Sequence, residues 1–172
     1  MSVMGIDPSL TSTGYVALLD DGGMEAGTVV CGGTRGMERL EQISGLLMSI
    51  ATQRHASLIA IEGYAFGAKG AAMFSLGELG GVIRHRLWKN GFSYIDVPPT
   101  MVKKFATGHG NSKKDEIMLA VYKRWDEEFR TSDEADAYVL ARIALALTEG
   151  DDNLTEFQRD VIKALQSKQP VA

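Results

Sequence analysis

Cysteine, proline and long apolar runs are scarce in this sequence, and each shortage excludes a class of protein. The chain of 172 residues holds one cysteine, Cys31, and four prolines. A lone cysteine cannot close an intramolecular disulfide or supply the several thiolates of a structural zinc site. The low proline content excludes collagen-like and proline-rich disordered chains.

No apolar run reaches the roughly 18 residues that a membrane-spanning helix needs. The first nine residues, MSVMGIDPS, lack the charged and apolar regions of a secretion signal. We therefore expect a protein that contacts no membrane and is not secreted. A hydrophobic fraction of 45% and a charged fraction of 23% are ordinary for a globular chain, and the length suits one domain.

Basic residues are outnumbered, since 18 Lys and Arg face 22 Asp and Glu, a net charge of -4. An acidic balance weighs against a nucleic-acid partner, because binding a polyanion normally requires a basic surface. The basic residues are nevertheless concentrated: residues 84–124 carry 9 of them against 3 acidic residues. Charge alone leaves two interpretations open, namely a nucleic-acid surface or a set of solvated helix faces.

Hydrophobic periodicity and turn residues predict an α/β domain built on one sheet. Apolar runs between turn residues predict strands over 2–7, 15–19, 24–31, 57–62 and 92–97. Apolar spacings of three and four predict helices over 35–54, within 67–88, and over 101–107, 113–125, 133–148 and 155–166. The expected N-caps of the last four helices are Thr100, Asn111 or Ser112, Ser132 and Thr155. We expect residues 1–150 to form the domain and residues 151–172 to be its C-terminal helical extension.

Two acidic residues stand where buried strands are expected to end. Asp7 follows the apolar run VMGI, and Glu62 follows LIAI. Asp and Glu are disfavoured in strands, so strand propensity does not explain either position. A turn opener would explain Asp7 before Pro8, but it explains the pair less well.

A helix supplies two more carboxylates. Within residues 132–147, the apolar positions Leu140, Ile143 and Leu147 continue backward at helical spacing to Asp136 and Asp133. Capping of the helix N-terminus accounts for Asp133 and poorly for Asp136. Carboxylates from three elements make an oxygen-rich site suited to Mg²⁺, with Mn²⁺ as a substitute, and such a site can catalyse phosphoryl transfer.

The motifs GIDPSLTSTGY, LIAIEGYAF, SLGELGG, PPTMVKKFATGHGNSKKDE and DEADAYVLARIAL, in this order over residues 2–148, resemble the RuvC family of Holliday junction resolvases. The resemblance implies a ribonuclease-H-like fold with a mixed five-stranded sheet flanked by helices. It also implies a Mg²⁺-dependent homodimer in the cytoplasm of a bacterial or phage-infected cell. Such a dimer cuts four-way junctions and related branched DNA by paired nicks, leaving 5′ phosphates and 3′ hydroxyls. The metal-binding and catalytic carboxylates would be Asp7, Glu62, Asp133 and Asp136.

The resemblance also places DNA contacts. They fall on one lysine of the pair Lys103 and Lys104 and on one of the pair Lys113 and Lys114. Tyr64 or Phe66 would stack at the opened junction, with Phe66 favoured over Tyr64. Hydrophobic core packing is the alternative explanation for an aromatic residue at this place.

Three other functions remain as alternatives. A nuclease of the same fold acting on RNA or an RNA–DNA hybrid is the nearest, because a metal site alone does not select the sugar. An actin-like or sugar-kinase-like protein uses a hairpin similar to GIDPSLTSTGY, but it needs two domains and a second phosphate loop. A DNA-binding module without catalysis would keep the basic residues yet leave Asp136 on an apolar stripe unexplained.

Overall fold

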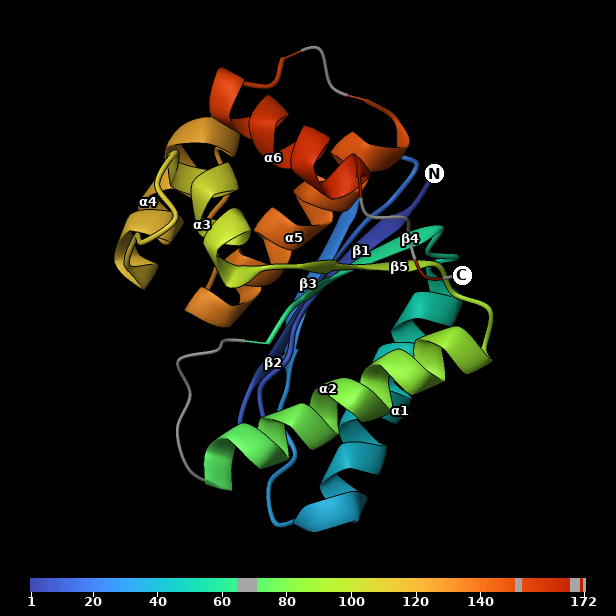
Figure 1. Cartoon of the computed structure of the whole chain (residues 1–172). Coiled ribbons are helices and arrows are strands. Elements are labelled where there is room, and N and C mark those ends of the chain that lie inside the picture. Colours follow the sequence, from blue (N-terminus) through green and yellow to red (C-terminus); the bar gives the residue numbers. More distant parts are fainter. Residues whose placement is uncertain (65–70, 151–152, 168–170, 172) are drawn as a thin grey trace.

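The computed structural model describes residues 1–64, 71–150, 153–167 and 171, and its elements follow the predicted order (Figure 1). The strands are β1 (Val3–Asp7), β2 (Thr13–Leu18), β3 (Met24–Val29), β4 (Leu58–Glu62) and β5 (Tyr94–Val97). The helices are α1 (Gly36–Gln53), α2 (Ala71–Lys89), α3 (Pro99–Thr107), α4 (Lys114–Trp125), α5 (Ser132–Thr148) and α6 (Glu156–Gln166). The predicted α/β class is confirmed. No helix among the described residues is both long and apolar enough to cross a membrane.

The five strands form one mixed sheet in the order β3-β2-β1-β4-β5. The pairs β1–β2 and β2–β3 are antiparallel, whereas β1–β4 and β4–β5 are parallel. Helices α1 and α2 lie on one side of the sheet, and α3 to α6 lie on the other (Figure 1). Because helices cover both sides of the sheet, its central strands β1 and β4 are buried on both faces and are almost continuously apolar.

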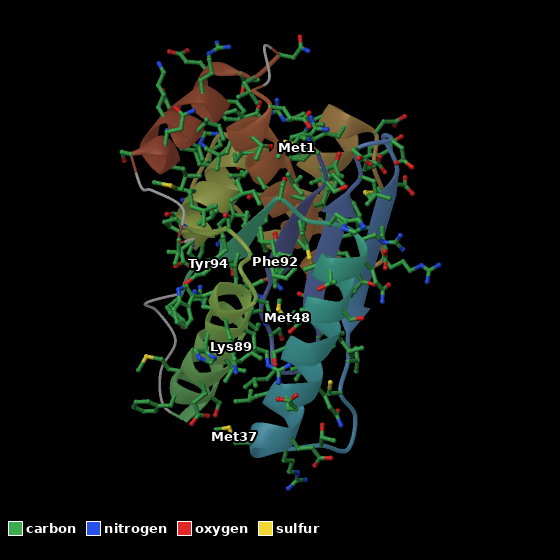
Figure 2. All side chains as sticks on the ribbon, turned by 90° about the vertical axis from the view of Figure 1, so that its right-hand side faces the viewer. Met1, Met37, Met48, Lys89, Phe92 and Tyr94 are labelled. Atoms are coloured by element: carbon green, nitrogen blue, oxygen red, sulfur yellow. The ribbon has the colours of Figure 1, made fainter. Side chains whose placement is uncertain are left out.

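Alternation along the strands divides the core into two clusters. Val3 of β1 packs with Leu58 of β4 in the cluster that includes α5. Met4 and Ile6 belong to the other cluster, which includes α1 and α2. Figure 2 shows this second side, where Met48, Phe92 and Tyr94 lie between the two helices and the sheet. Odd-numbered positions of β1, and even-numbered positions of β4, therefore face α5.

Three predicted N-caps are wrong. Thr131 caps α5, and its hydroxyl accepts a hydrogen bond from the Glu134 amide at 3.1 Å; Ser132 is already the first helical residue. Helix α3 begins at Pro99 behind Pro98, so Thr100 lies within it, because a proline with its fixed φ suits the first turn of a helix.

The third wrong N-cap is that of α4. Lys113 holds this position, and its amide donates to Glu116 at 2.8 Å. Ser112 instead shares a hydrogen bond with Thr107, its hydroxyl oxygen 2.8 Å away. Thr155 is confirmed as the cap of α6, and its amide donates to Gln158 at 3.0 Å.

The segment beyond α5 packs on the same sheet and helices. Helix α6 buries Val161, Ile162 and Leu165 in the α5 cluster. Val171 forms an antiparallel bridge with Tyr94 of β5, with N···O distances of 2.9 and 3.1 Å in the two directions. The edge strand β5 is therefore covered at this point by the chain's own C-terminal segment, which blunts a surface prone to nonspecific strand pairing.

Candidate active site

Strand register places Asp7 and Glu62 side by side. Ile6 of β1 pairs with Ile61 of the parallel strand β4, so the next residues in register are Asp7 and Glu62. Both continue the alternating positions that face α5. The two carboxylates predicted at strand ends thus project from neighbouring strands toward the same helix.

Helix α5 crosses these strand ends at very short range because two glycines lie beneath it. A Cβ atom on Gly5 of β1 would lie 2.0 Å from the Ala137 carbonyl oxygen. A Cβ atom on Gly14 of β2 would lie 2.1 Å from the Asp133 carbonyl oxygen, and Gly14 is the register partner of Asp7. The two glycines therefore let the first turns of α5, which carry Asp133 and Asp136, rest directly on the strands beside Asp7.

The electrostatics of these groups show that they are close to one another. Burial, followed by the charges of Glu62 and Asp136, raises the pKa of Asp7 well above its ordinary value. Burial and the charge of Glu62 raise the pKa of Asp136 to about 7. Burial also raises the pKa of Glu62, whereas a hydrogen bond with Asp7 opposes that rise. Carboxylates that are buried together resist ionisation, because like charges at short range repel strongly away from water.

Asp133 differs from the other three carboxylates in having a cationic partner. Its Oδ1 lies 3.2 Å from Lys114 Nζ, and the ion pair is partly exposed. This interaction raises the pKa of Lys114 against the opposing effect of burial. The capping explanation for Asp133 is incomplete, because its side chain binds Lys114 across to α4.

The donor set fits a hard divalent cation, although the side chains are not arranged as a closed cage. Within the described ranges, no group of three His, Cys, Asp or Glu side chains stands close enough to hold a metal ion as it is. The donors are all carboxylate oxygens, as Mg²⁺ and Mn²⁺ prefer. A cation would also remove the repulsion that raises the pKa of Asp7 and Asp136. In the chemistry of their donor atoms, the residues present therefore fit such an ion.

The structure divides each predicted lysine pair. Lys103 and Lys114 face the carboxylates, since their charges lower the pKa of Glu62. Lys104 points to α6, where its Nζ lies 3.4 Å from Asp160. Lys113 is an exposed residue at the N-terminus of α4. One lysine of each pair thus lies beside the site.

The basic segment as a whole does not form a single binding surface. Arg84 pairs with Asp96 at 2.6 Å, and Arg86 pairs with Glu41 of α1. Both arginines belong to α2, on the side of the sheet away from α5. The concentration of basic residues in the sequence therefore overstates the charge available to a nucleic acid.

Of the two aromatic residues predicted to stack at the junction, the structure describes only Tyr64. Tyr64 is 44% exposed and stacks against Arg84, whose guanidinium carbon lies 4.5 Å from the ring centroid. Phe66 lies outside the described residues. Arg84 was not predicted as part of this neighbourhood, and no local sequence signal could have found it, because it reaches Tyr64 from a separate helix.

Comparison with known proteins gives a family match over most of the chain. A family model described as crossover junction endodeoxyribonuclease RuvC matches residues 3–148. The protein of that name from Synechococcus sp. (strain WH7803) is 30% identical over 149 residues, which cover 82% of this chain and 96% of the relative.

Solved structures show the same fold. T. thermophilus RuvC in complex with Holliday junction substrate superposes with a TM-score of 0.73 at 20% identity, covering 99% of each chain. The yeast mitochondrial Holliday junction resolvase Ydc2 superposes with a TM-score of 0.54 at 12% identity, covering 96% of this chain and 80% of the other. The predicted ribonuclease-H-like fold is thereby confirmed. The alternative of an RNA or hybrid nuclease is not favoured, because the matching family model and relative are both described as endodeoxyribonucleases. Because the family model spans most of the sequence, the chain belongs to the RuvC family of crossover junction endodeoxyribonucleases, as its motifs predicted.

Proposed function

We propose that the chain resolves Holliday junctions and related branched DNA by paired nicks that leave 5′ phosphates and 3′ hydroxyls. Its catalytic carboxylates in this proposal are Asp7, Glu62, Asp133 and Asp136. The observation that carries the assignment is the convergence of carboxylates from β1, β4 and α5, where burial and the neighbouring carboxylates raise the pKa of Asp7 and Asp136. Such crowding costs stability and is typical of catalytic sites.

We assign Mg²⁺ to these carboxylates, with Mn²⁺ as a substitute. When bound, the divalent cations supply the Lewis acidity that activates water and stabilises the leaving 3′ oxygen. Asp7 and Glu62 hold their carboxylates at the ends of central strands, where the backbone is rigid. Asp136 lies over them from the second turn of a helix whose approach is fixed by Gly5 and Gly14.

Lys103 and Lys114 are the residues that we assign to the DNA backbone near the cut. Both lie beside the carboxylates, as their effect on the pKa of Asp136 indicates. An ammonium group at this place attracts the phosphate and offsets its repulsion by the acidic side chains. Lys114 can exchange its ion pair with Asp133 for a phosphate contact when a cation neutralises the carboxylates.

A second copy of the chain is the partner that paired nicks require. We place the contact on α2, whose residues Phe74, Gly77, Gly81 and Trp88 recur on one side of the helix at spacings of three, four and seven. Phe74 and Trp88 are exposed, and a Cβ atom at either glycine would meet open space. Exposed aromatic residues beside small ones suit the close packing of two helices.

We assign the protein to the cytoplasm of a bacterial or phage-infected cell, because a junction-cutting enzyme works where the DNA is.

A cleavage assay with purified protein, Mg²⁺ and synthetic DNA tests the proposal. We expect preferential cutting of a four-way junction over a linear duplex made from the same arms. Asp7→Asn should lower the cutting rate by about 10³-fold or more, because several kcal/mol of charge stabilisation are lost. Junction binding should persist in this variant.

Asp20→Asn in the exposed turn between β2 and β3 is the matched control and should cut like the unaltered chain. Equal cutting of the linear duplex would contradict the resolvase assignment. Unimpaired cutting by the Asp7→Asn protein would contradict the site.

A further inference from the structure

Arg84 ties three elements together behind the carboxylate site. Its Nε donates to Asp96 of β5 at 2.7 Å, and its Nη2 donates to the Glu62 carbonyl oxygen at 3.1 Å. The side chain comes from α2 and is only 11% exposed despite its charge. Since α2 lies across the sheet from α5, Arg84 holds the end of β4 from the side opposite the catalytic carboxylates (Figure 1).

The same guanidinium group supports Tyr64. This residue follows Glu62 by two positions, and its hydroxyl donates to the Gly77 carbonyl oxygen at 3.4 Å. With 44% of the residue exposed, the ring is held by Arg84 on one side while much of it still meets solvent. A small cavity of about 30 Å³ beside the ring is also lined by Pro8 and Glu62, so Tyr64 lies at the end of the sheet where β1 and β4 finish.

Gly80 leaves room for this stack. A Cβ atom there would lie 2.6 Å from Arg84 Nη1 and 2.7 Å from Tyr64 Cε1. Nη1 is itself buried and lacks a hydrogen-bond partner among the residues that the structure describes. A buried donor without a partner is unfavourable, and a simple ion pair with Asp96 would not require it. Gly80 leaves the space in which this nitrogen lies while the guanidinium group stands over the ring.

We propose that Arg84 is a positioning residue that fixes the Tyr64 ring at the end of the sheet that carries the carboxylates, so that a base displaced at the junction stacks on its exposed face. The proposal rests on the proposed junction-cutting function and deepens it. Base–aromatic stacking contributes about 1 to 3 kcal/mol, and an already ordered ring keeps more of that energy than a mobile one. Arg84 therefore acts on the DNA through Tyr64, without touching the reacting phosphate.

The test uses a four-way junction with 2-aminopurine at the branch point, whose fluorescence reports whether the base is stacked. Arg84→Met and Tyr64→Leu should each remove the fluorescence change that accompanies binding. Each should slow single-turnover cutting about tenfold at saturating protein, with the junction Kd changed less than about threefold. The double variant should be no slower than either single one, because both changes remove the same interaction.

Gly80→Ala is a second way to disrupt the contact, because it keeps the Arg84 and Tyr64 side chains and raises the helix propensity of α2. It should also remove the fluorescence change, since the new Cβ displaces the stack. Arg86→Met is the matched control, because Arg86 lies on the same helix and pairs with Glu41, and it should leave the signal and the rate unchanged.

Several outcomes would overturn this proposal and leave the proposed function intact. One is junction cutting by the unaltered chain without any fluorescence change. Another is a double variant slowed about a hundredfold, which would make the two residues independent. A third is loss of the signal in Phe66→Leu but not in Tyr64→Leu. An unaltered chain that cuts no junction would instead contradict the proposed function, while the fluorescence of the bound junction would still report on the Arg84 and Tyr64 variants.

Discussion

The two faces of the sheet differ in how many of their acidic side chains are paired. On the face covered by α1 and α2, Arg84 is paired with Asp96, and Arg86 with Glu41. On the face covered by α5, Asp133 is paired with Lys114, but Asp7, Glu62 and Asp136 crowd together, and burial and the neighbouring carboxylates raise the pKa of Asp7 and Asp136.

The first arrangement costs the fold little, because each arginine is paired and its acidic partner stays largely exposed to water. The second is unfavourable for folding and has a use only when a cation and a phosphate come to it. The comparison indicates that the α1/α2 face serves as a scaffold, whereas stability has been given up locally on the α5 face. Three predictions test how sharp this difference is.

Helix packing gives the largest expected effect. Gly5→Ala should lower the free energy of unfolding by about 3 kcal/mol or more, because the new Cβ would lie 2.0 Å from a backbone carbonyl of α5 that cannot move alone. Urea denaturation followed by circular dichroism measures the change. Gly14→Ala should act in the same direction through the Asp133 carbonyl.

The control lies on the other face. A Cβ atom on Gly45 of α1 would meet only the flexible end of Arg86, at 3.4 Å. Gly45→Ala should therefore stabilise the protein by about 0.5 to 1 kcal/mol through helix propensity. Equal losses from Gly5→Ala and Gly45→Ala would mean that the close approach of α5 is not special.

The cost of the crowded carboxylates should appear in the pH dependence of stability. Burial raises the pKa of Asp136 to about 7 from 3.8, so the fold favours its neutral form. Its contribution to stability is full below about pH 4 and is lost as the pH rises to about 7. Asp136→Asn, which stays neutral, should be more stable than the unaltered chain by about 1 to 3 kcal/mol at pH 8 in a chelator.

The same comparison at about pH 3 should show almost no difference, because Asp136 is then mostly neutral in both the folded and the unfolded chain. Excess Mg²⁺ at pH 8 should reduce the advantage of Asp136→Asn, since the cation offsets the repulsion. Urea denaturation at the two pH values measures both effects. A variant less stable than the unaltered chain at pH 8 would show that Asp136 contributes more as a packing or hydrogen-bonding group than it costs as a charge.

Sequence reasoning placed the carboxylates well because their geometry follows from local rules. Alternation along a strand and the period of a helix decide which way Asp7, Glu62 and Asp136 point. Parallel pairing of β1 with β4 then places Asp7 and Glu62 side by side. Arg84 escaped prediction because its contacts depend on a long side chain from another helix and on a glycine one turn away.

The lysine pairs could not be divided from the sequence for a related reason. Lys103 and Lys104 are neighbours on a short helix, and the choice between them depends on how α3 sits against α5 and α6. The N-caps of α4 and α5 were displaced by one or two residues because several adjacent polar residues could serve as caps, whereas α3 begins early because Pro99 suits its first turn. Hydrogen-bond geometry, which the sequence does not contain, selects among them.

The smallest expected effect separates the lysines that face the two environments. Lys103→Met with Lys114→Met removes two charges beside the carboxylates, whereas Lys104→Met with Lys113→Met removes the same charge elsewhere. In an Asp7→Asn background, which should bind without cutting, the first pair should weaken junction binding about tenfold. It should also flatten the dependence of log Kd on log salt by about 2, because each phosphate contact contributes close to one unit. The second pair should change the slope by less than half as much, since Lys104 remains engaged with Asp160 in the unaltered protein. Equal slopes would mean that DNA responds to the total charge of the basic segment, and position beside the carboxylates would then have no bearing on how the backbone is held.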